Sequence, residues 1–237
     1  MKEKVFRFKR FSVANDRAPM KVGTDGVLLG AWCTCRGARR VLDVGTGTGL
    51  IALMVAQRNV TALITGLDID AEATAEATAN FASSPWASRL TARHGDFLDF
   101  TPGDGDPYDL IVSNPPFFTQ DVRSPDSRRD LARNASSLPF GPMLGRAATL
   151  LAPTGRLALI TPVAARDAIQ EAAALSSLHV VRLTRVSSVE GRSAKRLLWE
   201  LSPQRAEMER ADLILHNADG SPTPPYASLV APFYLHL

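Results

Sequence analysis

The sequence predicts an α/β fold in which helices cover both faces of a mostly parallel sheet. Apolar runs typical of buried strands alternate along the chain with helical stretches. This rhythm requires crossover connections that place the helices on the faces of the sheet. The length of 237 residues suits one large domain with a sizeable core. We therefore expect a single domain over 1–237, with an N-terminal extension over 1–38 and the sheet core over 39–237.

The first half of the chain supplies the repeating strand and helix units. In chain order we expect a helix over 21–32 capped by Thr24 or Asp25, a strand over 40–45, a helix over 49–58, a strand over 62–70, a helix over 71–81, a short strand over 90–94 and a strand over 108–113. A helix over 142–151 and a strand over 155–161 repeat the unit. No linker long enough to divide the chain interrupts this order.

The pattern changes after residue 178, where two strand-like runs follow each other without a helix of any length between them. These runs, "HVVRLTRVSSV" and "AKRLLWELS", predict an antiparallel hairpin at the end of the sheet. The stretch "RADLILHNADG" would add one more strand. The core strands together indicate a sheet of about seven strands.

Composition excludes several classes of protein. No window approaches the roughly 18 apolar residues that span a bilayer, and the basic N-terminus lacks the apolar core of a signal peptide. We therefore expect a cytoplasmic protein without a membrane partner. Cys33 and Cys35 have no second Cys or His pair at zinc-like spacing, so we expect reduced, structurally incidental thiols and no metal. A net charge of +3 is too small to require a nucleic-acid partner.

A glycine loop follows the first strand of the core. In "LDVGTGTGL" the glycines stand at 45, 47 and 49, directly before a helix, where the backbone turns tightly and approaches a ligand with no Cβ in the way. The spacing is G-x-G-x-G with Asp43 ahead of it, whereas the dinucleotide fingerprint is G-x-G-x-x-G. This favours S-adenosylmethionine over a nicotinamide cofactor. The alternative is a purely structural glycine turn.

Acidic residues follow the next two strands. Asp68 ends the strand after the loop, where a carboxylate accepts hydrogen bonds from both ribose hydroxyls of a nucleoside. Asp70 begins the following helix, where its charge is favoured by the helix dipole. One strand further on, Asp96 offers an acceptor for an adenine amino group and Phe97 an apolar wall. Three strand ends in this order favour a nucleoside-containing cofactor.

The stretch "SNPPFF" ends the strand over 108–113 abruptly. Ligands of open α/β sheets bind outside the carboxyl ends of the strands, so this turn faces the cofactor site. A planar conjugated amine can give its two N–H bonds to the Asn114 side chain and the Pro115 carbonyl, with Phe117 as a stacking face. This arrangement aims the nitrogen lone pair at a methyl group by orientation, without a strong base. The alternative is a strand stop with a hydrophobic turn.

The four residues "NPPF" resemble the motif of the amino-methyltransferases that act on adenine N6, guanine N2 or the glutamine side-chain amide, the NPPY/NPPF class. The resemblance implies a Rossmann-like class I methyltransferase fold and S-adenosylmethionine as cofactor. Most members carry Tyr in the last position. Phe117 keeps the stacking face and loses the hydroxyl.

The flanking segments are similar, in order and over nearly the whole chain, to the bacterial enzymes that methylate N6 of adenine 37 in valine tRNA. The most specific segment is "FRFKRFSVANDRAPMKVGTDGVLLGAW". The resemblance implies a monomeric enzyme with tRNA as partner, whose extension over 1–38 covers substrate and cofactor. Lys21, Thr24 and Asp25 would close over the methionine end of the cofactor. The expected cofactor residues are Lys21, Thr24, Asp43, Gly45, Thr46, Gly47, Gly49, Asp68, Ile69, Asp96, Phe97 and Asn114.

The expected RNA contacts follow the catalytic turn. Phosphates of an anticodon loop would be held by Arg123, Arg128, Arg129 and Arg133. Many relatives carry an aromatic residue or His where this chain has Asn134. Near the N-terminus Phe6 and Phe8 alternate with basic residues, so a strand here would bury both rings and present its charges. This pattern suits either RNA contact or an ordinary protected edge strand.

Three other functions stay open at this point. A guanine-N2 methyltransferase of rRNA and a glutamine-N5 methyltransferase of protein share the motif. The glutamine enzymes generally carry a separate helical N-terminal domain, whereas only about 40 residues precede the first core strand here. A non-catalytic RNA-binding relative is the third, although Asp43, Asp68 and Asn114 are all retained.

Overall fold

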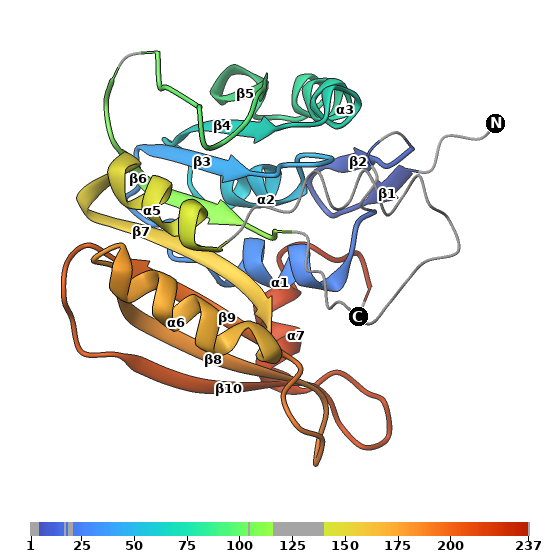
Figure 1. Ribbon diagram of the computed structural model, residues 1–237. Helices are drawn as coiled ribbons and strands as arrows, with labels where there is room; N and C mark the ends of the chain where they lie inside the picture. Colours follow the sequence, from blue (N-terminus) through green and yellow to red (C-terminus); the bar gives the residue numbers. More distant parts are fainter. Residues whose placement is uncertain (1–4, 17, 19–20, 104, 116–139, 237) are drawn as a thin grey trace, which may run out of the picture.

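The computed structural model describes residues 5–16, 18, 21–103, 105–115 and 140–236 (Figure 1). Within them an eight-stranded sheet forms the centre of the molecule, and a two-stranded sheet near the N-terminus lies beside it. Helices cover both faces of the large sheet, as the alternation of strands and helices predicts.

The large sheet is parallel over its central part. Its strands are β3 (Arg40–Val44), β4 (Leu63–Asp68), β5 (Leu90–His94), β6 (Tyr108–Ser113), β7 (Leu151–Pro162), β8 (His179–Val189), β9 (Arg196–Ser202) and β10 (Glu209–His216). The order across the sheet is β10-β8-β9-β7-β6-β3-β4-β5. Strand β9 runs antiparallel between β7 and β8, which confirms the predicted hairpin. Strand β10 pairs parallel with β8 and brings the sheet to eight strands, one more than the core units alone indicate.

Two hydrophobic clusters fill the space between the sheet and its helices. The helices are α1 (Thr24–Trp32), α2 (Leu50–Arg58), α3 (Ala71–Ala82), α5 (Phe140–Leu150), α6 (Arg166–Leu175) and α7 (Pro224–Val230), with short 3-10 turns η1 (Ala87–Arg89) and η2 (Val163–Ala165). One cluster joins α1, α2, α3 and α7 to one face of the sheet. The other joins α5 and α6 to the opposite face. Helix α6 was not among the predicted elements.

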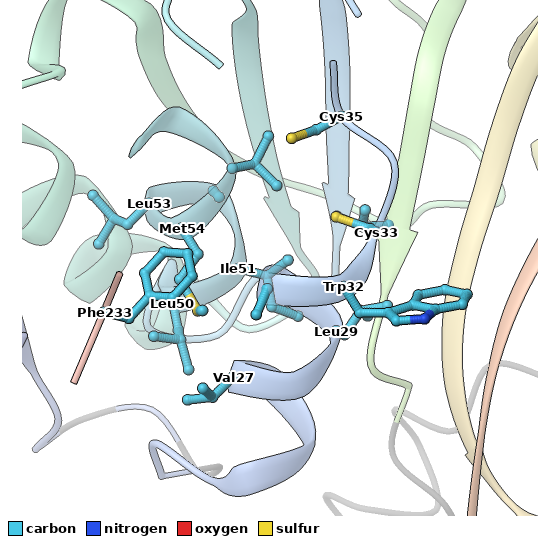
Figure 2. Packing of buried hydrophobic residues seen from close by; sticks show 14 of the residues in the cluster. Val27, Leu29, Trp32, Cys33, Cys35, Leu50, Ile51, Leu53, Met54 and Phe233 are labelled. Atoms are coloured by element: carbon cyan, nitrogen blue, oxygen red, sulfur yellow. The ribbon is translucent and has the colours of Figure 1, made fainter. Parts of the chain in front are cut away.

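Helices α1 and α2 pack closely, and the two cysteines lie in this part of the core (Figure 2). A Cβ added to Gly30 would come within 2.8 Å of the sulfur of Met54, so glycine permits the close contact of the two helices.

Cys33 and Cys35 are free and buried, as the prediction of incidental thiols requires. Burial raises the pKa of Cys33 to about 12, so this thiol stays protonated and unreactive.

The N-terminal extension differs in two details from its prediction. Strands β1 (Val5–Arg7) and β2 (Ser12–Ala14) form the small antiparallel sheet. Phe8 is 4% exposed, but Phe6 is 38% exposed, so only one of the two rings is buried. The residue that caps α1 is Gly23, without a side-chain hydrogen bond, so the predicted cap by Thr24 or Asp25 is wrong.

Asp25 is instead held by an ion pair. Its Oδ2 lies 2.8 Å from Nε of Arg196, at the start of β9. The Arg196 guanidinium therefore engages the carboxylate that the predicted cap would have used. The difference arises because the partner lies 171 positions away in the sequence.

The register brings the carboxyl ends of β3, β4, β5 and β6 to one edge, which we call the carboxyl edge. Val44 of β3 pairs with Leu67 of β4 on one side and with Ser113 of β6 on the other. Asp68 in turn pairs with His94 of β5. From β3 the chain continues first to β4 and β5 on one side of the sheet and then to β6 and β7 on the other. The loop after β3 therefore lies at the point where the strand order reverses. Such points are where open α/β sheets bind ligands.

Candidate functional site

The glycine loop after β3 is fixed by backbone hydrogen bonds to the end of β4. The N–H groups of Gly45 and Thr46 both donate to the Leu67 carbonyl, at 2.8 and 3.0 Å. The loop glycines all have positive φ, with values of 68° at Gly45, 54° at Gly47 and 82° at Gly49. Side chains rarely adopt these angles, which explains why the loop is glycine at alternate positions.

Two of the glycines leave open space above the loop, and the third packs into the core. A Cβ built on Gly45 or Gly47 would meet no atom within 4 Å. A Cβ on Gly49 would come within 2.4 Å of the Phe81 ring. The loop therefore presents its backbone to a ligand at Gly45 and Gly47, while Gly49 is needed for packing against α3.

Asp68 links the loop to the end of β4. Its Oδ2 accepts from the Gly47 N–H at 2.8 Å, and its Oδ1 accepts from the Asp70 N–H at 2.9 Å. Burial is the largest influence on this group and raises the pKa of Asp68. Asp70 caps α3 by accepting from the N–H groups of Glu72 and Ala73, which confirms its predicted place at the helix start.

Asp43 lies beneath the loop and is fully buried. Its Oδ2 accepts from the Thr46 hydroxyl at 2.8 Å and from the Ala52 N–H at 3.1 Å. Its Oδ1 has no hydrogen-bond partner among the described residues. Burial raises the pKa of Asp43 to about 7, because the carboxylate loses more hydration than these two bonds return. Asp43 and Thr46 thus support the loop from below, and their contact with a cofactor stays a prediction.

Asn114 follows β6 at the same edge. Its side-chain oxygen is buried and has no hydrogen-bond partner among the described residues. The preceding Ser113 is held by its hydroxyl, which donates to the Val44 carbonyl at 2.8 Å. This bond ties the end of β6 to the start of the glycine loop. A buried amide oxygen without a donor is costly, so a ligand that supplies an N–H would stabilise it.

The loop after β5 completes the edge. Phe97 is 4% exposed and packs in the cluster that holds the sheet to α5 and α6, so it is a wall of the core. Asp96 accepts from the Leu98 N–H at 2.9 Å. Ile69 is 48% exposed directly after Asp68, and its carbonyl lies 3.0 Å from Nε2 of His94. An exposed apolar side chain at this point gives the edge a face for a planar ring.

Two residues of the N-terminal extension also lie among the predicted cofactor set. The ammonium of Lys21 donates to the Asn15 carbonyl at 2.8 Å and reaches the carbonyls of Asp16 and Ala18 at 3.3 and 3.4 Å. Thr24 is exposed at the first residue of α1. Lys21 therefore stabilises a turn of its own segment, and contact of Lys21 or Thr24 with a cofactor stays a prediction.

Several predicted residues lie outside the described residues. These are Phe117 of the catalytic turn, the arginines Arg123, Arg128, Arg129 and Arg133, and Asn134. Pro115 is described and buried. The roles expected of Pro115, Phe117, the four arginines and Asn134 stay predictions.

Two buried polar residues of α3 were not singled out by the sequence pattern. Asn80 and Glu76 are 3% and 4% exposed. Asn80 donates to the carbonyl of Thr48, inside the glycine loop, at 2.8 Å. The only signal was the presence of polar residues on the otherwise apolar face of this helix. Their partners lie far away in the sequence, so spacing alone cannot reveal them.

Neither a membrane span nor a metal centre is found in the part of the chain that the structure describes. None of its helices is long and apolar enough to cross a bilayer. No group of three or more His, Cys, Asp or Glu side chains in these residues could hold a metal ion.

Comparisons with known proteins agree with this geometry. The family model of the methyltransferase small domain matches residues 25–168. A curated tRNA1(Val) (adenine(37)-N6)-methyltransferase of Aeromonas hydrophila is 42% identical over 233 residues, which is 98% of either chain. The protein of the same name from Parabacteroides distasonis is 46% identical over 197 residues, or 83% of either chain.

The fold has a counterpart among solved structures. A protein described as a predicted O-methyltransferase from Agrobacterium tumefaciens has a TM-score of 0.69, with 21% identity, 88% of this chain and 96% of that chain covered. The likeness supports the fold class predicted from the strand order and the glycine loop. The matched family model covers the glycine loop, Asp68 and Asn114 together. The chain belongs to the methyltransferase small domain family and has the class I methyltransferase fold.

Proposed function

We propose that this protein transfers a methyl group from S-adenosylmethionine to N6 of adenosine 37 in the anticodon loop of valine tRNA. The single observation that carries the acceptor chemistry is the buried side-chain oxygen of Asn114, which has no hydrogen-bond partner among the described residues. The names of the full-length relatives, at 42% and 46% identity, supply the tRNA substrate.

The carboxyl edge fits S-adenosylmethionine. Open space lies over Gly45 and Gly47, so the cofactor can lie against their backbone. Asp68 lies at the end of β4 beside Gly47, where its carboxylate would hold the ribose hydroxyls. Ile69 and Asp96, from neighbouring strand ends, would contact the adenine ring and its amino group. When bound, the cofactor supplies a sulfonium-activated methyl group.

Asn114 and Pro115 would orient the acceptor. An exocyclic amine gives one N–H to the Asn114 oxygen and the other to the Pro115 carbonyl. These bonds turn the nitrogen lone pair out of conjugation with the ring and toward the methyl group. The nitrogen becomes cationic as it accepts the methyl group and only then releases a proton. No strong base is needed, in keeping with the neutral amide at this position.

The remaining parts of the proposal concern RNA and the cell. Phe117 would stack on the target base, which is flipped out of the loop. Arg123, Arg128, Arg129 and Arg133 would hold the neighbouring phosphates. The extension over 1–38 would cover cofactor and substrate within one domain, with contacts from Lys21, Thr24 and Asp25. We place the enzyme in the cytoplasm, where tRNA is found, and expect it to act as a monomer.

Methylation of bulk tRNA tests the proposal. Purified protein is incubated with S-adenosylmethionine carrying an isotopically labelled methyl group and with tRNA, rRNA or release factor in separate reactions. Nucleosides or peptides are then analysed by mass spectrometry. We expect labelled N6-methyladenosine from tRNA, mapped by nuclease fragments to the anticodon loop. Asn114→Ala protein is the control for a contaminating enzyme and should give far less label than the wild type in the same time.

Two results would contradict the proposal. Label on N2 of guanosine in rRNA, or on a glutamine of release factor, with none on tRNA, would reassign the substrate. Cofactor binding without label on any of the three would indicate a non-catalytic RNA-binding relative.

A further inference from the structure

Glu76 and Asn80 of helix α3 attach the N-terminal segment to the body of the protein beside the glycine loop. The two carboxylate oxygens of Glu76 accept from the N–H groups of Asp16 and Ala18, at 2.7 and 2.8 Å. One turn further along α3, the Asn80 amide bonds both to the N–H and to the carbonyl of Ala14, at 2.8 and 3.0 Å. Asp16 and Ala18 are thus held by the Glu76 side chain, and Ala14, which also pairs with Val5 of β1, is held by Asn80.

The same attachment reaches the glycine loop directly. The Nδ2 group of Asn80 donates to the Thr48 carbonyl at 2.8 Å as well as to Ala14. One side chain therefore fixes the extension and the loop relative to each other. Both Asn80 and Glu76 are nearly fully buried, so their hydrogen bonds are shielded from competing water.

The far end of the segment is fixed to α2. The ammonium of Lys21 closes the turn by donating to the Asn15 carbonyl. At the start of α1, a Cβ added to Gly26 would come within 3.1 Å of the Leu50 side chain, so α1 packs directly on the first residue of α2. Ala14 therefore contacts α3 and Gly26 contacts α2, the two helices that flank the glycine loop.

We propose that Glu76 is a positioning residue for the cofactor. It holds the backbone amides of Asp16 and Ala18 in place, so that these two residues form a preformed flank of the cofactor site instead of ordering only when the cofactor binds. Because this flank is already ordered, cofactor binding does not incur the entropic cost of ordering it. The inference rests on the proposed cofactor, S-adenosylmethionine, but not on the identity of the methyl acceptor.

Replacement of one acceptor tests this role. In Glu76→Gln the side chain keeps its shape, but one of its oxygens becomes an NH2 group that cannot accept from Asp16 or Ala18. We expect the amides of Asp16 and Ala18 to exchange hydrogen faster. The dissociation constant for S-adenosylmethionine, measured by calorimetry without RNA, should rise about tenfold, the effect of losing one hydrogen bond to a charged group. The KM for the cofactor should rise in parallel, with kcat at saturating cofactor close to wild type.

Asn59→Ala is the matched control. Asn59 is also buried and donates to two backbone carbonyls, those of Cys35 and Ala38, but on the side of the core away from the carboxyl edge. It should lower the melting temperature and leave cofactor affinity unchanged. Wild-type affinity in Glu76→Gln despite faster exchange at Asp16 and Ala18, or an equal loss of affinity in the control, would overturn the proposal.

A second variant covers the case in which Glu76→Gln does not fold. Asp16→Pro removes the N–H that donates to Glu76 from the exposed side of the contact and leaves α3 intact. It should weaken cofactor binding in the same direction, and unchanged affinity would count against the proposal. If cofactor affinity depends on the Glu76 contacts but the protein methylates rRNA and not tRNA, the role of Glu76 stands and the proposed tRNA substrate is wrong.

Discussion

The N–H of Gly47 donates to Oδ2 of Asp68 at 2.8 Å, so the glycine loop and the end of β4 are held to each other by a carboxylate. The other oxygen of Asp68 accepts from the N–H of Asp70, which begins α3. A single side chain thus sets the shape of the loop and the start of the next helix. This double use makes Asp68 a sensitive position for cofactor binding.

Asp68→Asn should raise the dissociation constant for S-adenosylmethionine at least tenfold, measured by calorimetry. The amide cannot accept at both atoms, so either the Gly47 or the Asp70 N–H loses its partner. Asp70→Ala is the control on the same loop. It removes the cap of α3 and should cost about 1 kcal/mol of unfolding free energy, with little change in affinity. Equal affinities for Asp68→Asn and wild type would contradict the role of Asp68.

Asn114→Ala should lower kcat by about 10²–10³-fold, the usual effect of removing one oriented hydrogen-bond partner from a reacting group. Cofactor affinity should stay within about twofold, because the proposed contact is with the acceptor amine. Single-turnover kinetics and calorimetry measure the two quantities separately. Equal loss of turnover and cofactor binding would mean that Asn114 holds the cofactor instead.

Ser113→Ala provides the neighbouring control for Asn114. The variant loses the hydrogen bond from the Ser113 hydroxyl to the Val44 carbonyl, which should lower the unfolding free energy by about 1 kcal/mol. Because the serine does not reach the acceptor, kcat should fall far less than in Asn114→Ala. A fall as large as that of Asn114→Ala would show that strand geometry, rather than the amide, limits the rate.

Asp43 should make the stability of the cofactor-free protein depend on pH. Burial raises the pKa of Asp43 from 3.8 to about 7, so the folded state binds the proton more strongly than the unfolded state does. The resulting contribution to stability is fully present below pH 3.8 and is lost as pH rises through about 7. Asp43→Asn removes this dependence. Relative to wild type, the variant should therefore gain up to about 4 kcal/mol between pH 4 and pH 8 in urea titrations.

A constant difference between Asp43→Asn and wild type across this range would contradict the assignment. Asp68→Asn is not a suitable control, because burial also raises the pKa of Asp68. The exposed Asp219, whose pKa is lowered by the Ser221 hydrogen bonds, should give a smaller effect of opposite sign when replaced by Asn.

The glycines of the loop should differ in how they tolerate a side chain. Gly45→Ala adds a Cβ in open space and should cost about 1 kcal/mol, the penalty of the left-handed backbone alone. Gly49→Ala adds the same strain and also places the Cβ 2.4 Å from the Phe81 ring. Overpacking should cost a further 1–3 kcal/mol or so. Thermal unfolding of the two variants compares them directly, and equal losses would argue against a closely packed Gly49.

Much of the fold could be predicted because it depends on local patterns. The alternation of apolar strands and helices gave the parallel core, and the glycine spacing with Asp68 gave the loop and the acid that braces it. Asn114 could be placed at the carboxyl edge because β6 is an apolar run with a clear end. Each of these signals lies within a few residues of the feature it predicts.

The features that escaped prediction depend on partners distant in the sequence. Glu76 accepts from backbone amides 58 and 60 positions away, and Asp25 pairs with an arginine 171 positions away. An isolated helix pattern favours Asp25 as a cap, but tertiary pairing with Arg196 prevails. Helix α6 also escaped, because its mostly small and polar stretch has few large apolar residues to mark the buried face.

The insertion of β9 between β7 and β8 has a consequence for synthesis of the chain. Until Arg196–Ser202 has left the ribosome, the pairing positions Leu157–Pro162 of β7 have no neighbour on that side. A free edge of this kind is a template for association with other chains. Strand β7 is therefore synthesised well before β9, the strand that covers this edge. A chain that stalls between α6 and β9 should be a substrate for chaperones.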